Sequence, residues 1–85
     1  GTGASDVFIS VNGVTNGLQV DANANIYPTK SASTTMTGGF FYIPAAPGAP
    51  TGVPSSVGGH LPMYFDATNN NFYIYNGAWK KVTLT

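Results

Sequence analysis

The sequence contains no cysteine, so no disulfide can hold this chain of 85 residues together. A chain of this size buries only about 60–65% of the surface that its unfolded form exposes, so its hydrophobic core is small. Stability must therefore come from contacts within that small core or from contacts between copies of the chain.

Charge is equally scarce. The sequence has no arginine and no glutamate, and its three lysines and three aspartates bring the charged fraction to 7%, against roughly 25% in an average soluble domain. Binding of nucleic acid requires a basic surface, which this composition excludes. No run reaches the ~18 apolar residues that a membrane span needs, so we expect no membrane insertion. With 13% aromatic residues, a surface so poor in charge is expected to be buried between copies or to bind neutral ligands.

Glutamate and arginine, two residues that favour helices, are absent. The chain has instead eleven glycines, six prolines and many Thr, Ser and Asn residues. This composition predicts an all-β, turn-rich chain. Turns are expected at Asn12-Gly13 and Asn16-Gly17, and residues 21–25 are expected to be a short polar linker. The predicted N-terminal strands are 6–11, 18–21 and 26–27.

The most informative stretch is the last third of the chain. Two aromatic runs, Met63–Phe65 and Phe72–Tyr75, flank the polar run Asp66–Asn71, a pattern typical of two strands joined by a loop. Asn76-Gly77 then gives a strong signal for a two-residue hairpin turn. With a third strand at Ala78–Leu84, the sequence predicts a C-terminal antiparallel meander.

A two-residue turn fixes the register of the last two strands. It predicts that Ile74 lies opposite Trp79 and that Tyr73 lies opposite Lys80. One face would then carry Phe72, Ile74 and Trp79. The other would carry Tyr73, Tyr75, Lys80, Val82 and Leu84. Because both faces include apolar side chains, this sheet should need cover on both sides.

The middle of the chain has a different character. Phe40–Ile43 is its most apolar run and predicts a buried strand that Pro44 ends. Prolines then recur at 44, 47, 50 and 54, a spacing that suits either an extended polyproline ribbon along a neighbouring subunit or a plain loop. The predicted organisation is an N-terminal fibre-like β segment (1–37), a buried strand with a Pro/Gly-rich extended linker (38–60) and the meander (61–85).

The order of three motifs gives a resemblance. Gly39-Phe-Phe-Tyr-Ile-Pro44 before the Pro/Gly-rich stretch, then Pro62-Met-Tyr-Phe-Asp66, then Phe72-Tyr-Ile-Tyr-Asn-Gly-Ala-Trp79, resembles modules of tailed-bacteriophage fibre and appendage proteins and of related bacterial surface proteins. The resemblance covers residues 38–82. It implies an intertwined homotrimeric fibre or knob in a virion, extracellular, joined to other virion proteins through its N-terminal side and contacting a host surface receptor.

Catalysis is poorly supported by these residues. Glycoside hydrolysis normally uses two carboxylates, and Asp66 is the only acid in the aromatic half of the chain. His60 stands alone without a recognisable nucleophile motif. We expect no enzyme, no cofactor and no metal site, although three copies of His60 around a threefold axis would supply three imidazoles.

Two sets of residues are candidates for contacts. Tyr64, Tyr73, Tyr75 and Trp79 could stack on a sugar, or pack in the core. The candidate receptor-binding residues are Asn69, Asn70, Asn71, Tyr73 and Tyr75. The candidate core or trimer-packing residues are Phe40, Phe41, Ile43, Phe72, Ile74 and Trp79. The predicted function is attachment of a virion fibre to a host surface receptor, which we expect to be a glycan. The alternatives are a purely structural capsid or tail decoration protein and a monomeric carbohydrate-binding module.

Overall fold

A computed structural model describes residues 7–10 and 16–85 of the chain. These residues form strands, turns and extended segments without a helix, as the composition predicts, and therefore include none that is long and apolar enough to cross a membrane. The chain divides into two compact units, Gly1–Phe41 and Tyr42–Thr85.

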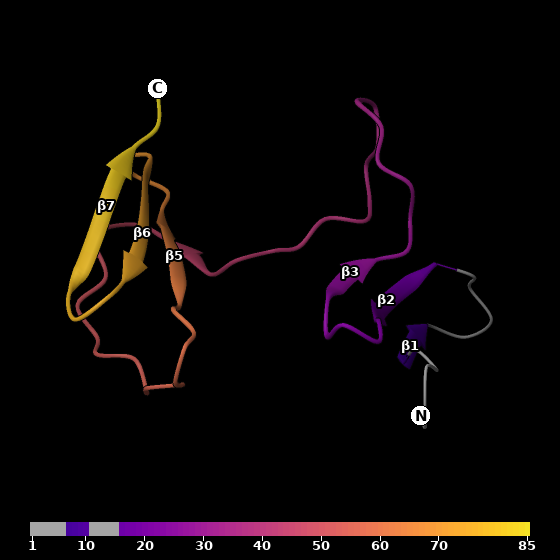
Figure 1. The fold of residues 1–85 in the computed structure, drawn as a ribbon. Helices are drawn as coiled ribbons and strands as arrows, with labels where there is room; N and C mark the ends of the chain where they lie inside the picture. Colours follow the sequence, from indigo (N-terminus) through magenta and orange to yellow (C-terminus); the bar gives the residue numbers. More distant parts are fainter. Residues whose placement is uncertain (1–6, 11–15) are drawn as a thin grey trace. The chain divides into compact units, whose positions relative to one another are not determined.

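The first unit contains a three-stranded antiparallel sheet in the order β1 (Val7–Ser10), β2 (Gly17–Val20) and β3 (Ile26–Pro28) (Figure 1). All three predicted strands are confirmed, and no bound differs by more than one residue. Gly17 begins β2 instead of ending a turn. The main chain there passes so close to the Ile9 carbonyl that a side chain would collide with it, so the position requires glycine. The predicted turn at Asn12-Gly13 lies outside the described residues.

The predicted polar linker at 21–25 is a tight hairpin corner. Oδ1 of Asp21 accepts hydrogen bonds from the backbone N–H groups of Asn23 (2.9 Å) and Asn25 (3.0 Å). Oδ2 accepts a third from the Asn25 side-chain amide at 3.1 Å. These bonds lower the pKa of Asp21, with the Asn25 N–H as the largest cause. An aspartate that satisfies its own loop in this way explains why β2 and β3 turn sharply.

The second unit contains a four-stranded sheet in the order β4 (Ala45–Ala46), β5 (Met63–Asp66), β6 (Asn71–Tyr75) and β7 (Trp79–Thr83) (Figure 1). Strands β5, β6 and β7 form the predicted antiparallel meander. Strand β4 was not predicted, and it pairs with β5 in parallel.

The predicted register of the last hairpin is wrong by one residue. Tyr75 lies opposite Trp79, and Tyr73 lies opposite Lys81. The loop has three residues, 76–78, with Gly77 at a positive φ of 76° and the Asn76 N–H bonded to the Ala78 carbonyl at 3.0 Å. Because side chains alternate along a strand, a slip of one residue moves every side chain of β7 to the other face of the sheet.

The observed register therefore sorts the two faces differently. One face, called the aromatic face below, carries Tyr64, Asp66, Asn71, Tyr73, Tyr75, Trp79, Lys81 and Thr83. The other, called the open face, carries Met63, Phe65, Phe72, Ile74, Lys80 and Val82. Trp79 thus lies with Tyr73 and Tyr75, and not with Phe72 and Ile74 as predicted.

The predicted buried strand at Phe40–Ile43 is also wrong. These residues form no strand; Phe40, Phe41 and Tyr42 are exposed, Tyr42 to 86%, and Ile43 is half-buried. The run spans the boundary between the two units, and an apolar run alone does not reveal whether a neighbouring layer covers it. Residues 42–60 belong to the same compact unit as the meander, whereas the sequence suggested a separate linker at 38–60.

Candidate functional site

The Pro/Gly-rich segment, residues 44–54, is attached to the sheet of its own chain. It begins with β4, where the N–H of Phe65 donates to the Pro44 carbonyl (2.9 Å) and the N–H of Ala67 donates to the Ala46 carbonyl (3.0 Å). Beyond β4, three side chains from the aromatic face bond to the main chain of the segment. The segment therefore needs no neighbouring subunit to be held in place.

Asp66 provides the first of these attachments, and its side chain is completely buried. Oδ1 accepts the N–H of Gly48 at 2.9 Å, across 18 residues of sequence, and also the N–H groups of Thr68 (3.0 Å) and Asn69 (3.2 Å). Oδ2 accepts the Asn69 side-chain amide at 2.9 Å. The Asn69 amide, followed by these N–H groups, holds the pKa of Asp66 below its usual value although burial acts in the opposite direction. The loop predicted at 66–71 is confirmed, and Asp66 begins it with an Asx-type turn. The same carboxylate also fixes Gly48.

Tyr64 and Trp79 provide the other two attachments. The Tyr64 hydroxyl donates to the Gly48 carbonyl at 3.0 Å and lies 3.3 Å from that of Ala46. Nε1 of Trp79 donates to the Gly52 carbonyl at 2.7 Å, across 27 residues of sequence. Gly48 is thus bonded through both its N–H and its carbonyl, at a positive φ of 92° that favours glycine.

The aromatic rings pack against one another beneath the segment. Trp79 lies edge-on to Tyr75, with ring centroids 5.1 Å apart, and edge-on to Tyr73 at 6.4 Å. Tyr64 contacts both Tyr73 and Trp79 at 6.2 Å. Tyr73 is only 7% exposed and is the buried hydrophobic residue at the centre of this cluster.

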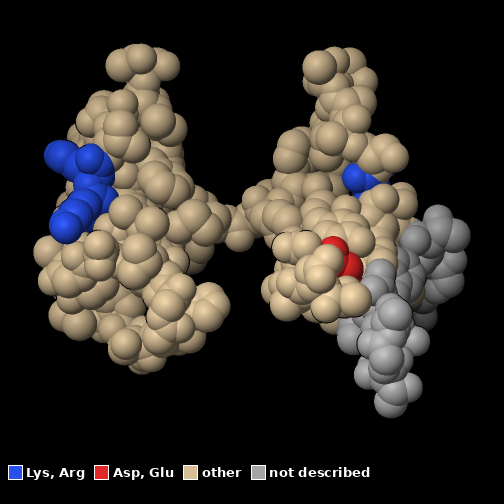
Figure 2. Space-filling model, in the orientation of Figure 1, with Lys and Arg blue, Asp and Glu red and all other residues tan. Residues whose placement is uncertain are grey.

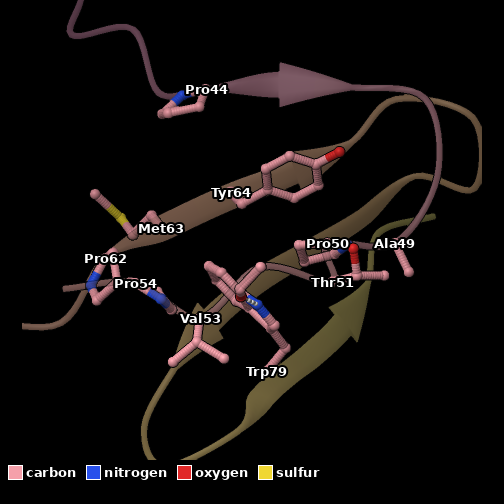
Figure 3. A pocket seen from close by; sticks show the side chains of 11 residues that line it. Pro44, Ala49, Pro50, Thr51, Val53, Pro54, Pro62, Met63, Tyr64 and Trp79 are labelled. Carbon is pink, nitrogen blue, oxygen red and sulfur yellow. Dashed lines mark hydrogen bonds between the residues drawn. The ribbon is translucent and has the colours of Figure 1, made fainter.

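An open groove of about 550 Å³ lies between the segment and the sheet. Figure 3 shows Tyr64 and Met63 on β5 along one side of it, and the loop through Pro50, Thr51 and Val53 along the other. Trp79 lies beside Val53 on the side of the loop. The remaining lining residues are Pro44, Ala49, Gly52, Pro54 and Pro62. No lining side chain is charged, so the groove is suited to a neutral ligand with an apolar surface.

The structure separates the predicted receptor-binding residues into three groups by their exposure. Asn71 and Tyr73 are buried, at 6% and 7% exposure, so little of either is accessible to a partner. Asn69 and Asn70 are exposed, although their side-chain amides are bonded to Asp66 and to the Leu84 carbonyl. Tyr75 is half-buried against Trp79. Thr83 bonds to the buried Asn71 through its hydroxyl at 2.6 Å, so Asn71 serves the packing of β6 on β7.

The predicted packing residues lie in three places. Phe72 and Ile74 are half-buried on the open face, where a shallow hollow of about 240 Å³ runs between them and the side chains of β7. Trp79 belongs to the aromatic face, and Phe40, Phe41 and Ile43 lie outside any strand. Residues 42–85 offer nothing that covers the open face, where Met63 and Val82 are 44% and 55% exposed. Packing of these residues on another copy of the chain stays a prediction.

No pattern in the sequence predicted the groove itself. Tyr64 and Trp79 stood out as aromatic residues, but Pro50 and Val53 gave no signal of their own. Only the segment's return over the sheet, fixed by bonds to Gly48 and Gly52, brings these residues opposite Tyr64. His60 does not take part: its Nδ1 lies 2.7 Å from the Gly58 carbonyl, and residues 7–10 and 16–85 contain no cluster of three metal-ligating side chains.

A comparison of the chain with protein-family models, with curated proteins and with solved structures found no match. Its function is therefore inferred from its own residues and their geometry.

Proposed function

We propose that this chain is a module of a homotrimeric virion fibre that attaches to a neutral glycan on a host surface through the groove of its second unit. The observation that carries the proposal is the groove itself, which combines Tyr64, Trp79 and several prolines without any charged side chain. Aromatic and proline rings offer flat apolar surfaces to the C–H faces of sugar rings, and nearby carbonyl and hydroxyl groups accept or donate hydrogen bonds.

The charge distribution supports a neutral ligand. Asp66 is buried, so the charged side chains at the surface of residues 42–85 are those of Lys80 and Lys81 on β7. In the view of Figure 2, charged groups occupy small areas and most of the surface drawn is uncharged. An anionic glycan would be expected to meet a basic groove. Lys81 shares the aromatic face with Tyr73, but neither lysine lines the groove.

The open face supports the homotrimer. It presents Met63, Phe65, Phe72, Ile74 and Val82 on one side of a sheet that the chain's second unit leaves uncovered. A sheet with an apolar face is stable when a second layer packs on it, and further copies of the same chain supply such a layer in a symmetric assembly. Of the sheet residues that line the groove, Tyr64 and Trp79 lie on the aromatic face and Met63 lies on the open face. Assembly through the open face would therefore leave the aromatic side of the groove accessible to a receptor.

Binding to an array of immobilised neutral and anionic oligosaccharides tests the ligand class. Val53 lines the groove and is 80% exposed, so Val53→Asp should place a charge in the groove without disturbing the core. We expect the unmodified chain to bind neutral glycans and Val53→Asp to bind them at least about tenfold more weakly, since a carboxylate on an apolar binding surface loses hydration when the ligand covers it. Val57→Asp is the matched control, because Val57 is 61% exposed and lies outside the groove.

Preferential binding of anionic glycans, or no binding of neutral ones, would contradict the proposed ligand. Equal losses in the two variants would show that the groove is not the contact. Light scattering on a sizing column tests the assembly separately, with three copies expected.

A second candidate is a monomeric carbohydrate-binding module. The observation that favours it is that every residue lining the groove comes from residues 44–79 of a single chain, so the site is complete without a partner. A single-chain mass together with glycan binding would select this function over the fibre. A trimer without glycan binding would favour the purely structural decoration protein.

A further inference from the structure

Asparagine followed by glycine is chemically labile. The backbone nitrogen of the glycine attacks the side-chain amide carbon of the asparagine, a C–N bond forms, and the amide nitrogen leaves as ammonia together with the proton that the attacking nitrogen gives up. Water then opens the five-membered succinimide to aspartate or isoaspartate. The reaction is fastest before glycine, since no side chain shields the attacking nitrogen. The described residues contain two such sites, Asn16-Gly17 and Asn76-Gly77.

We propose that Asn76 is a site of spontaneous deamidation and that this modification alters the hairpin loop next to Trp79. The inference is independent of the proposed function. Its co-reactant is water alone.

The loop at 76–78 leaves the attacking nitrogen available. Within the described part of the chain, the Gly77 N–H has no hydrogen-bond partner, and the bond that closes the loop runs instead from the Asn76 N–H to the Ala78 carbonyl. Asn76 and Gly77 are both exposed, and no heavy atom outside the immediate chain neighbours lies within 4 Å of the position that a Cβ on Gly77 would take. Neither a bond nor steric crowding has to be removed before the ring closes.

Asn16-Gly17 differs at each of these points and provides an internal control. The Gly17 N–H donates to the Thr29 hydroxyl at 2.8 Å, and Gly17 itself is half-buried within β2, against the Ile9 carbonyl. Attack by this nitrogen requires the hydrogen bond to open and the strand end to separate. One hydrogen bond of ordinary strength reduces the population of the open form by about fivefold, and separation of the strand end reduces it further. Asn16 should therefore react at least about tenfold more slowly than Asn76.

Modification of Asn76 should change the packing of the aromatic cluster. Isoaspartate inserts one additional carbon into the main chain of a loop that has only three residues and that places Tyr75 opposite Trp79. A longer main chain no longer fits the same closing bond, so the contact between the Tyr75 and Trp79 rings, now 5.1 Å between centroids, should loosen. Since Trp79 is the chain's single tryptophan, its fluorescence reports the change directly.

The test is incubation of the full chain at mildly alkaline pH in water labelled with oxygen-18. Proteolysis and mass spectrometry of the peptides that contain Asn16 and Asn76 follow. Oxygen incorporation measures succinimide opening at each site, and an isoaspartyl methyltransferase identifies the isoaspartate form. A parallel incubation in concentrated urea removes the structural protection. We expect Asn76 to react at least about tenfold faster than Asn16 in the folded chain, and the two rates to converge in urea.

Equal rates in the folded chain, or a faster reaction at Asn16, would overturn the proposal. A rate ratio unchanged by urea would overturn it as well, because the difference would then come from local sequence. For the effect on the cluster, Asn76→Gln is the matched variant, since the longer side chain cyclises far more slowly. Its Trp79 fluorescence should stay constant over the incubation, while that of the unmodified chain shifts in step with isoaspartate formation; no shift at full modification would overturn the link to the aromatic cluster.

Discussion

Replacement of Trp79 by alanine is expected to lower the free energy of unfolding of the second unit by about 2–3 kcal/mol. The indole packs against Tyr64, Tyr73 and Tyr75 at centroid distances of 6.2, 6.4 and 5.1 Å, and its Nε1 donates to the Gly52 carbonyl at 2.7 Å. Truncation of a fully buried tryptophan costs about 3–5 kcal/mol. Because Trp79 is only half-buried, we expect a smaller loss of about 2–3 kcal/mol.

Trp79→Phe separates the two contributions. It keeps a ring on the aromatic face but removes the donor to Gly52, which should cost about 1 kcal/mol. Stabilities of about 0.05–0.15 kcal/mol per residue give a unit of this size only ~2–7 kcal/mol in total. The alanine variant should therefore come close to unfolding the unit, whereas the phenylalanine variant should remain folded.

Hydrogen exchange of the β6 backbone amides in the full chain, followed by NMR, measures these changes locally and does not depend on tryptophan fluorescence. Unchanged protection of β6 in Trp79→Ala would refute the assignment of Trp79 to the packed face. Equal losses in the two variants would show that the bond to Gly52, and not the ring packing, carries the stabilisation.

Two further predictions concern the attachment of the Pro/Gly-rich segment. Hydrogen bonds lower the pKa of Asp66 in the folded chain below its ordinary 3.8, so the stability that they contribute is fully present above that pH and is lost as the pH falls through the folded value. Asp66→Asn should thus weaken this acid-induced loss of stability, measured as the melting temperature of each protein over a series of acidic pH values. Asp21 is present in both proteins, so its contribution cancels. An identical pH dependence of the two melting temperatures would contradict the role of Asp66. Tyr64→Phe removes the hydroxyl that holds Gly48 and should speed exchange of the Gly48 amide by about fivefold, the equivalent of one hydrogen bond. Tyr42→Phe, at an 86% exposed position, should leave this exchange unchanged. Equal exchange in Tyr64→Phe and the unmodified chain would show that Asp66 suffices to hold Gly48.

The strands and their corners follow from local residue chemistry. Short β-rich runs separated by Asp, Asn and Gly predicted all the antiparallel strands, because these residues hydrogen-bond their own backbone and tolerate a positive φ. The corners at Asp21 and Asp66 share the same design: an aspartate at or just after the end of a strand, followed by alanine, accepts N–H groups from the loop that it begins. Local information of this kind lies within a few neighbouring residues, so the sequence is sufficient to predict it.

The register of the last hairpin was harder to predict from the sequence. Asn76-Gly77 is compatible with a two-residue turn and equally with the first two residues of a three-residue loop. The choice between them depends on which face of β7 packs best, and burial of Trp79 against the three tyrosines decides it. The prediction of a buried strand at 40–43 was wrong for a related reason. Burial of this run depends on a covering layer, and residues 7–10 and 16–85 place none over Phe40, Phe41 and Tyr42.

The sequence by itself determined the all-β class, the meander, the loop at 66–71 and a surface almost free of charge, because each depends on composition or on residues close together in the chain. Only the tertiary structure decided that the Pro/Gly-rich segment returns over its own sheet and forms a groove there. The bonds that hold it join Asp66 to Gly48 and Trp79 to Gly52, across 18 and 27 residues. Each ends on a main-chain group of a glycine, and main-chain N–H and C=O groups are the same at almost every residue, so no sequence pattern marks which of them a distant side chain will bind.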